Sequence, residues 1–404
     1  MVSARAEPSG LIQTETLPDV ARVWRGRAAG AMMTETVSRV FLLFVFALLG
    51  CATASPTTPP AMPSAEARPP VSSEPSRAPG AAALERGQAL IARGEMAAAA
   101  SALREAVRLQ PDSIDARTSL GLALYALGDL DAAVEELRAA LRRRPDAIEA
   151  RLTLARVLVA RQEWPAAREE LERVLSAQPD RVDARYALGV VRYAQGDGAG
   201  AIDAYRRVLA VDPQQQDARY NLALVLKLAR RDAEATPEFV AAAQGGHARA
   251  QYFAGTAYAA GLGVDRSLSS AIAWWFRAAE QGVPQADEAL AQLRQVALGR
   301  GRGAAAERQA AEQAFADYRA AMWTDFPDLT ATADDTIGAA LLRQGRAAEA
   351  VAVLIREASA LSQPAQRQLE ALYEQGVDGL PARDPRILAY MKGAAAEGLR
   401  PPLR

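Results

Sequence analysis

Cysteine and histidine are almost absent from this 404-residue sequence, which contains one residue of each. A disulfide within the chain is therefore excluded, and a zinc site would need mostly carboxylate ligands. Charge of one sign is not in excess either, because 47 Lys and Arg residues nearly cancel 48 Asp and Glu residues. Such a balance gives no long-range attraction to nucleic acid. We expect no metal, no cofactor and no nucleic-acid partner.

Aromatic residues are also scarce, at 6% of the chain, and β-branched residues are few. Alanine, leucine, arginine and glutamate are abundant instead, and half of all residues are hydrophobic. These residue types favour packed helices over sheets. The composition therefore predicts an all-α protein.

Long hydrophobic runs are missing, and the main apolar segment, residues 40–50, ends directly before Cys51. This run is too short to span a bilayer as a helix, but it suits the core of a signal peptide. It resembles the lipobox of bacterial lipoproteins, in which Cys51 would be acylated and become the mature amino terminus. With Ala52 after the cysteine, the resemblance implies an outer-membrane lipoprotein that faces the periplasm. A buried apolar segment with an incidental cysteine is the alternative.

Three segments are expected ahead of the folded part of the chain. Residues 1–32 are interpreted as a misassigned start, with translation beginning at Met32 or Met33, or as an extended leader. Residues 33–50 form the expected signal peptide. Residues 51–80 are rich in proline and have little to bury, which predicts a disordered tether.

A short motif recurs at a fixed interval after the tether. Its copies begin at Pro111, Pro145, Pro179 and Pro213, which are 34 residues apart. A period of this length predicts a stack of helix pairs. Small residues such as Gly121 and Ala133 recur among apolar ones at helical spacing, as expected where two helices approach each other closely.

The motif itself is expected to join one helix pair to the next. Proline stops the preceding helix, because the residue before it is disfavoured in the helical region. We expect the aspartate that follows to cap the next helix, at Asp112, Asp146 and Asp180. An acidic residue then falls in the first turn of that helix, at Asp115, Glu149, Asp183 and Asp217. The arginines that end the copies, called the closing arginines, are predicted to form a row on the helix surface, with a ligand-binding row of basic residues as the alternative. They are Arg117, Arg151, Arg185 and Arg219.

This pattern closely resembles the tetratricopeptide repeat, whose small, apolar and proline positions are occupied in the fourth copy by Leu188, Gly189, Ala201, Tyr205 and Pro213. The resemblance covers about five repeats over residues 81–245 and implies a right-handed α-solenoid of helix-turn-helix repeats. Residues 246–292 resemble a Sel-one-like repeat through Gly255, Tyr258, Gly261, Gly263, Trp274 and Gly282. A linker and a helix are expected over 293–333. A helix pair and a degenerate Sel-one-like repeat are expected over 334–404.

A tetratricopeptide array is expected to bind proteins in a groove lined by the first helix of each repeat. The inward positions of these helices predict a partner-binding groove made by Tyr125, Arg156, Tyr186, Tyr193, Tyr220 and Lys227. Aromatic anchors of this kind are enriched at protein interfaces. A tyrosine packed in the core is the alternative for each aromatic position. The partner is expected to be a protein or peptide, with no small-molecule substrate.

Catalytic motifs do not accompany these repeats. The glycine-rich stretch at 299–304 lacks the strand before it and the Lys-Ser or Lys-Thr after it that a phosphate loop needs, so we expect a linker. His247 is expected to be a satisfied or exposed side chain, with a catalytic base as the alternative. Trp274 and Trp275 are expected to divide between the core and the surface of one helix, with a binding aromatic patch as the alternative. The sequence predicts a non-enzymatic, lipid-anchored envelope scaffold that acts as an adaptor or assembly factor. A pilotin-like factor for a secretin or pilus machine, and a cell-envelope enzyme with a dispersed site, are the alternatives.

Overall fold

The computed structural model describes residues 79–300, 304–329 and 336–399. The expected leader, signal peptide, acylation site Cys51 and most of the tether lie outside these residues. Within them the chain is helical, and the only strand-like feature is an isolated bridge between Val377 and Leu380. No helix in this part is long and apolar enough to cross a membrane. The predicted all-α class is confirmed.

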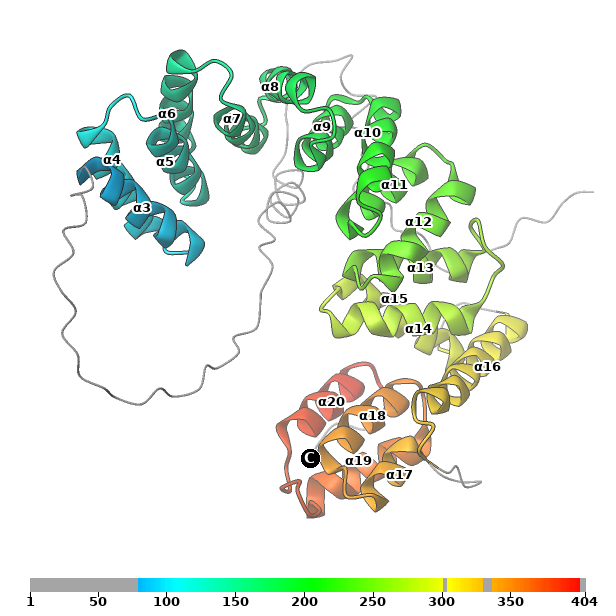
Figure 1. The fold of residues 1–404 in the computed structure, drawn as a ribbon. Helices are drawn as coiled ribbons and strands as arrows, with labels where there is room; N and C mark the ends of the chain where they lie inside the picture. The colour runs from blue at the N-terminus through cyan, green and yellow to red at the C-terminus, as the bar shows by residue number, and fades with distance from the viewer. Residues whose placement is uncertain (1–78, 301–303, 330–335, 400–404) are drawn as a thin grey trace, which may run out of the picture. The chain divides into compact units, whose positions relative to one another are not determined.

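The described helices form two compact units, of which the first ends at Val225 and the second begins at Leu226. The division therefore falls inside one helix, α11. Successive helices of the amino-terminal unit form pairs joined by short turns (Figure 1). They are α3 (Pro79–Ala92), α4 (Met96–Leu109), α5 (Ile114–Ala126), α6 (Leu130–Arg143), α7 (Ile148–Ala160), α8 (Trp164–Ala177), α9 (Val182–Gln195), α10 (Gly198–Val211) and α11 (Gln216–Leu228).

Within each pair, a small residue on the first helix receives a large side chain from the second. A Cβ atom placed on Gly121 would lie 2.6 Å from Cγ of Leu137, which is fully buried. The same close approach joins Gly87 to Leu103 and Gly189 to Tyr205. The small residues predicted at the helix contacts are therefore confirmed, and they allow the backbones to approach closely enough to exclude water.

The predicted caps of the recurring motif lie one residue too early. In the first copy, the N–H of Ser113 donates to the carbonyl of Gln110 at 3.0 Å, so Pro111 and Asp112 are the two central residues of a turn. Helix α5 then begins at Ile114, and the hydroxyl of Ser113 accepts from the N–H of Ala116 at 3.2 Å. The predicted aspartate caps are wrong because proline and aspartate are used to make the turn.

The later copies have the same turn, with Ala147 and Arg181 at the N-cap positions. Neither residue caps its helix with a side-chain hydrogen bond. The predicted acidic residues are confirmed in the first turns of α5, α7, α9 and α11, where they face the positive end of the helix dipole.

The closing arginines hold the joint together. Each donates to the carbonyl of the proline six residues earlier, in the pairs Arg117–Pro111, Arg151–Pro145, Arg185–Pro179 and Arg219–Pro213. Arg117 and Arg151 also form ion pairs with Glu136 and Glu170 on the second helix of their own repeats. The guanidinium groups of this row therefore stabilise the connections between helices, which supports the structural interpretation over the ligand-binding row of basic residues.

The carboxy-terminal unit continues as packed helices and contains a Gly-rich turn between α13 and α14. It also contains the short 3-10 helix η2 (Trp323–Asp325). Its helices are α12 (Asp232–Gln244), α13 (Ala248–Ala260), α14 (Leu268–Glu280), α15 (Pro284–Ala297), α16 (Ala305–Met322), α17 (Ile337–Arg343), α18 (Ala347–Ser359), α19 (Gln363–Gln375) and α20 (Pro385–Ala396). One hydrophobic core joins α14, α15 and α16 to α17 and α18, and a second lies between α18, α19 and α20.

The single histidine and the tryptophan pair have structural positions in this unit. His247 is the N-cap residue of α13, and its Nδ1 accepts from the N–H of Ala250 at 3.1 Å. Trp275 is 1% exposed and packs against Gly255, whereas Trp274 is half-buried beside the guanidinium of Arg277. The two tryptophans divide between core and surface, as expected.

Candidate protein-binding face

The first helices of successive repeats lie side by side in the amino-terminal unit. Contacts beyond neighbouring elements join α3 to α5, α5 to α7 and α7 to α9, whereas any contacts among α4, α6, α8 and α10 in the described part of the chain are fewer. In a curved stack, the layer whose members touch is the inner one. We call the exposed side of α5, α7 and α9 the inner face, and it corresponds to the predicted groove.

The structure places the predicted site residues at different depths. Tyr125, Arg156 and Tyr193 are half-buried, and so part of each side chain is accessible to a partner. Tyr186 and Tyr220 are each 7% exposed, which places most of both rings among packed side chains. Lys227 is half-buried and belongs to the carboxy-terminal unit.

Tyr186 packs within its own repeat and also contacts the first helix of the next repeat. Its hydroxyl accepts a hydrogen bond of 2.9 Å from the amide of Asn221 on α11, and its ring centroid lies 5.9 Å from that of Tyr205 on α10. Burial raises the pKa of the Tyr186 hydroxyl above its ordinary value. Sequence reasoning did not identify Asn221, because its partner lies 35 residues away and no local pattern marks the pair.

Charged side chains of the inner face are paired between neighbouring repeats. Arg156 on α7 contacts Asp183 on α9 at 3.0 Å, and Arg181 contacts Glu149 at 2.7 Å and Asp183 at 2.8 Å. These hydrogen bonds, first to Glu149 and then to Asp183, raise the pKa of the Arg181 guanidinium. Two cations and two anions therefore balance at this place. Such exposed pairs add little to stability, but they fix the positions of charges that a partner would meet.

Tyr125 and Arg156 form the aromatic and cationic edge of this network. Burial raises the pKa of the Tyr125 hydroxyl, and the positive charge of Arg156 partly offsets the rise. Tyr193, whose pKa is also raised by burial, lies at the far end of α9. The inner face combines aromatic surface with fixed charges of both signs.

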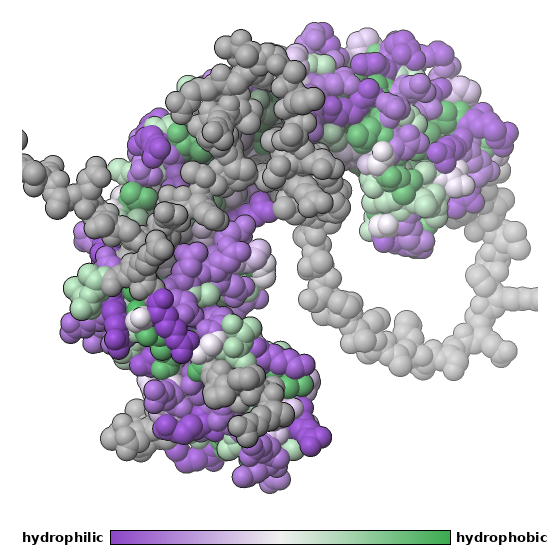
Figure 2. Space-filling model, turned by 180° about the vertical axis from the view of Figure 1, so that it is seen from behind, coloured by the Kyte–Doolittle hydropathy of each residue, from purple (hydrophilic) through white to green (hydrophobic). Residues whose placement is uncertain are grey.

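Hydrophobic side chains are dispersed over the side of the described surface that Figure 2 shows. On the side shown in Figure 2, hydrophilic side chains cover most of the described surface and hydrophobic ones form small separate areas. Large exposed hydrophobic side chains include Leu109, Leu127 and Val211, which lie at or beyond helix ends. Within the described residues, no group of three or more His, Cys, Asp or Glu side chains could hold a metal ion.

Helix pairs stacked through their first helices define an α-solenoid, a class of protein-interaction scaffold. The sequence profile of the tetratricopeptide repeat matches residues 80–148, 152–214 and 191–246. The chain thus contains tetratricopeptide repeats over these segments, and this part of the prediction is confirmed. No curated protein matches the chain in sequence.

Two solved structures are among those that match part of the chain. MamA from Desulfovibrio magneticus RS-1 is 23% identical with a TM-score of 0.39, and the match covers 43% of this chain and 96% of that one. PilF from Pseudomonas aeruginosa is 20% identical with a TM-score of 0.46, and the match covers 52% of this chain and 95% of that one.

Proposed function

We propose that the protein is a non-catalytic adaptor or assembly factor, anchored by lipid in the bacterial envelope, which binds a segment of another protein along its inner face. The observation that carries this proposal is the side-by-side packing of α5, α7 and α9. These helices carry Tyr125, Arg156 and Tyr193, which belong to three consecutive tetratricopeptide repeats and are each partly exposed. A surface of this extent suits an extended or helical segment.

Burial assigns different roles to the tyrosines of the inner face. Tyr125 and Tyr193 are accessible and suit direct contact, since partly exposed aromatic side chains often carry much of the binding energy at interfaces. Tyr186 and Tyr220 are better suited to support the face from beneath, because each ring is more than nine-tenths covered. Arg156 and Asp183 would set the charges that the partner must match.

The lipid anchor is supported by the sequence alone. Cys51 is the single cysteine of the chain and follows an apolar segment of signal-peptide length. The proline-rich residues 51–80 would then separate the repeats from the membrane surface. Periplasmic exposure from the outer membrane and the Sel-one-like interpretation of residues 246–292 remain predictions.

Site-specific photo-crosslinking in intact cells tests the inner face. A photoreactive residue at Tyr125 or Tyr193 should capture the same partner, whereas one at Arg138, exposed on the second helix α6, should not. Equal capture from all three positions, or capture from Arg138 alone, would move the binding surface elsewhere.

The anchor has a separate test. Wild-type protein extracted from membranes should carry acyl chains on Cys51, since stable anchoring needs more than one chain. Cys51→Ser removes the acylation site and should therefore release the protein into the soluble fraction. An unmodified Cys51 in membrane-extracted protein contradicts the anchor while leaving the inner-face proposal intact.

A further inference from the structure

The second helices of the first two repeats carry a cluster of exposed arginines. α4 and α6 both pack against α5, and each bears arginines along its carboxy-terminal half. We call the exposed and unpaired members the arginine patch: Arg104, Arg108, Arg138, Arg142 and Arg144. The near-zero net charge of the whole chain therefore hides a local excess of positive charge.

Helical spacing places four members of the patch in two like-charge pairs. Arg104 and Arg108 are four residues apart on α4. Arg138 and Arg142 occupy the equivalent positions on α6, 34 residues later. Side chains at this spacing are neighbours on one helix face, and like charges there repel each other. An anionic partner that lies across the patch would turn this repulsion into attraction.

The carboxy-terminal ends of α4 and α6 lie close together. Nη1 of Arg143, in the last turn of α6, contacts Oδ1 of Asp112 at 2.8 Å, and Asp112 lies in the turn that follows α4. Glu105 on α4 is engaged by an arginine of α3 at 2.7 Å. Glu135 and Asp146 are exposed acidic residues near the patch in sequence, and they are fewer than its five arginines. The patch therefore keeps a net positive charge.

Arginines on the second helices of later repeats are paired instead. On α8, Arg168 contacts Glu172 at 2.7 Å, and on α10, Arg207 contacts Asp203 at 3.1 Å. The side chains of the arginine patch form no ion pair or hydrogen bond in the described part of the chain. The unpaired charge thus occurs in the two repeats nearest to Pro79, where the described chain begins.

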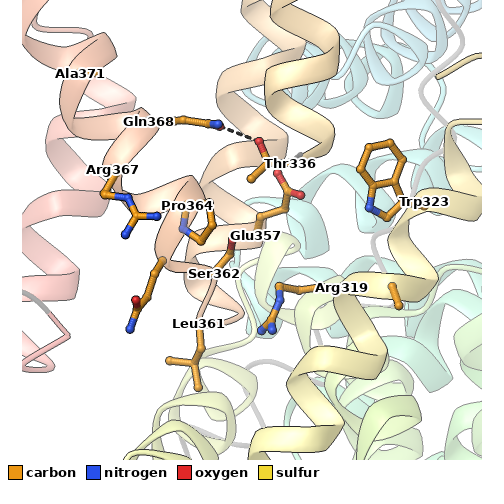
Figure 3. Close-up of a pocket in the computed structure, with 12 residues that line it drawn as sticks. Arg319, Trp323, Thr336, Glu357, Leu361, Ser362, Pro364, Arg367, Gln368 and Ala371 are labelled. Carbon is orange, nitrogen blue, oxygen red and sulfur yellow. Dashed lines mark hydrogen bonds between the residues drawn. The ribbon is translucent and has the colours of Figure 1, made fainter. Parts of the chain in front are cut away.

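A pocket of about 900 Å³ in the carboxy-terminal unit shows the opposite situation (Figure 3). The carboxylate of Glu357 accepts from the N–H of Ile337 at 2.9 Å, and the hydroxyl of Thr336 donates to Gln368 at 2.6 Å. The guanidinium of Arg319 donates to a backbone carbonyl. The protein itself engages these polar groups of the pocket, whereas the arginine patch offers its guanidinium groups to an outside partner.

We propose that the arginine patch contacts the anionic phospholipid headgroups of the membrane that holds the lipid anchor. This inference rests on the proposed acylation of Cys51. Residues 52–78 separate Cys51 from Pro79, and a stretch of this length spans at most roughly 80 Å when extended, so the patch can reach the surface. Guanidinium groups form paired hydrogen bonds with phosphate, and a basic patch strengthens binding by lipid chains.

The membrane contact leaves the inner face available. The patch lies on the second helices α4 and α6, whereas the inner face is made by the first helices α5, α7 and α9. A partner protein can therefore bind the inner face while the arginine patch faces the headgroups.

Vesicle co-sedimentation of the full chain with Cys51→Ser tests the proposal without any acyl chain. Vesicles of equimolar phosphatidylglycerol and phosphatidylcholine should bind the protein at least about ten times more tightly than vesicles of phosphatidylcholine alone. Apolar segments of the chain contribute to both measurements, so the ratio reports the charge. About 0.5 M salt should remove most of the difference by screening.

Variants assign the binding to the patch. Arg138→Gln with Arg142→Gln should weaken binding to the anionic vesicles at least about tenfold, because each arginine near an anionic surface adds to the attraction. The circular dichroism spectrum should not change, since both side chains are exposed and unpaired in the described structure. Arg367→Gln with Lys392→Gln removes two exposed positive charges from the carboxy-terminal unit and should leave binding unchanged.

Three results would overturn the proposal. The first is equal binding to both kinds of vesicle. The second is an equal effect of the patch variant and its control, which would mean that net charge alone decides. The third is capture of a protein by a photoreactive residue at Arg138 in intact cells, which would assign the patch to a protein partner. An unmodified Cys51 in the wild-type protein would contradict the anchor, but it would not alter the vesicle result.

Discussion

Gly121→Ala should destabilise the amino-terminal unit, although the same change stabilises most helices. An added Cβ would lie 2.6 Å from Cγ and 2.8 Å from Cδ2 of Leu137, both far inside normal contact distance. Leu137 cannot move aside into solvent, because it is fully buried between the two helices of the repeat. The helices must therefore separate, or Leu137 must leave its preferred rotamer.

The magnitude is the difference between two opposing effects. Overpacking of a closely packed core costs about 1–3 kcal/mol. Replacing glycine by alanine inside a helix contributes about 1 kcal/mol in the stabilising direction. We expect a net loss of about 1 kcal/mol in the free energy of unfolding, and a loss of several kcal/mol for Gly121→Leu, which adds three more carbon atoms at the same place.

Urea denaturation followed by circular dichroism measures this loss in a double-mutant cycle. Leu137→Ala should cost about 2–5 kcal/mol by itself. In that background the clash is removed, and so Gly121→Ala should become stabilising by about 1 kcal/mol. Gly393→Ala is the matched control, because a Cβ at this position in α20 has no atom within 4 Å and should stabilise its helix. Stabilisation by Gly121→Ala in both backgrounds would refute the packing argument.

Three further variants test other contacts. Tyr186→Phe removes the acceptor of the buried Asn221 amide and should lower the urea midpoint, because an unpaired buried donor costs about 1–3 kcal/mol; an unchanged midpoint would show that the bond is dispensable. The hydrogen-bonded ion pair of Asp384 with the arginine two residues later holds the pKa of the Asp384 carboxyl below its ordinary value of about 4. The ion pair therefore stabilises the fold above about pH 4, and this stabilisation is lost as the pH falls through the folded-state pKa. Asp384→Asn keeps a capping residue but should flatten the acid side of the stability curve measured by thermal melts, and identical curves would exclude this role. Arg151→Met should destabilise the third repeat by about 1–3 kcal/mol in urea melts, because the carboxylate of Glu170 has little solvent and would keep only its pair with the exposed Arg173. A loss below about 0.5 kcal/mol would mean that Arg173 and solvent compensate.

The helix pairs could be predicted from the sequence because the 34-residue period fixes both helices and their contact. Gly121 and Leu137 are 16 residues apart, and the same spacing separates Gly87 from Leu103 and places Ala155 opposite Leu171. A pattern that repeats at this interval is visible without any structure. The caps were predicted wrongly because Asp112 can serve either a turn or a helix end. Only the hydrogen bond from Ser113 to Gln110 shows which of the two forms.

The candidate site was less predictable, because periodicity gives the direction of a side chain and not its depth. Tyr186, Tyr193 and Tyr220 occupy inward positions of first helices, yet only Tyr193 keeps appreciable exposure. The depth of Tyr186 depends on Asn221 and Tyr205, which come from other helices. The pocket lined by residues of α16, η2, α18 and α19 follows no repeat pattern, so the sequence alone did not indicate it.

The fourth repeat shows how the array tolerates departures from its own pattern. Ala204 occupies the place of the glutamate that pairs with the closing arginine in earlier repeats, and in the described structure Arg185 bonds to the carbonyl of Pro179 without a carboxylate partner. Arg192 replaces an apolar residue of the first helix, and its Nη1 donates to the carbonyl of Gly200 at 3.2 Å while its buried Nε lacks a partner. A backbone carbonyl thus accepts from each of these two guanidinium groups, although the Nε of Arg192 stays unpaired. Polar residues can therefore vary between repeats as long as the small residue, the large residue opposite it and the proline turn are kept. These three positions recur in the sequence, which explains why the 34-residue period can be recognised from them.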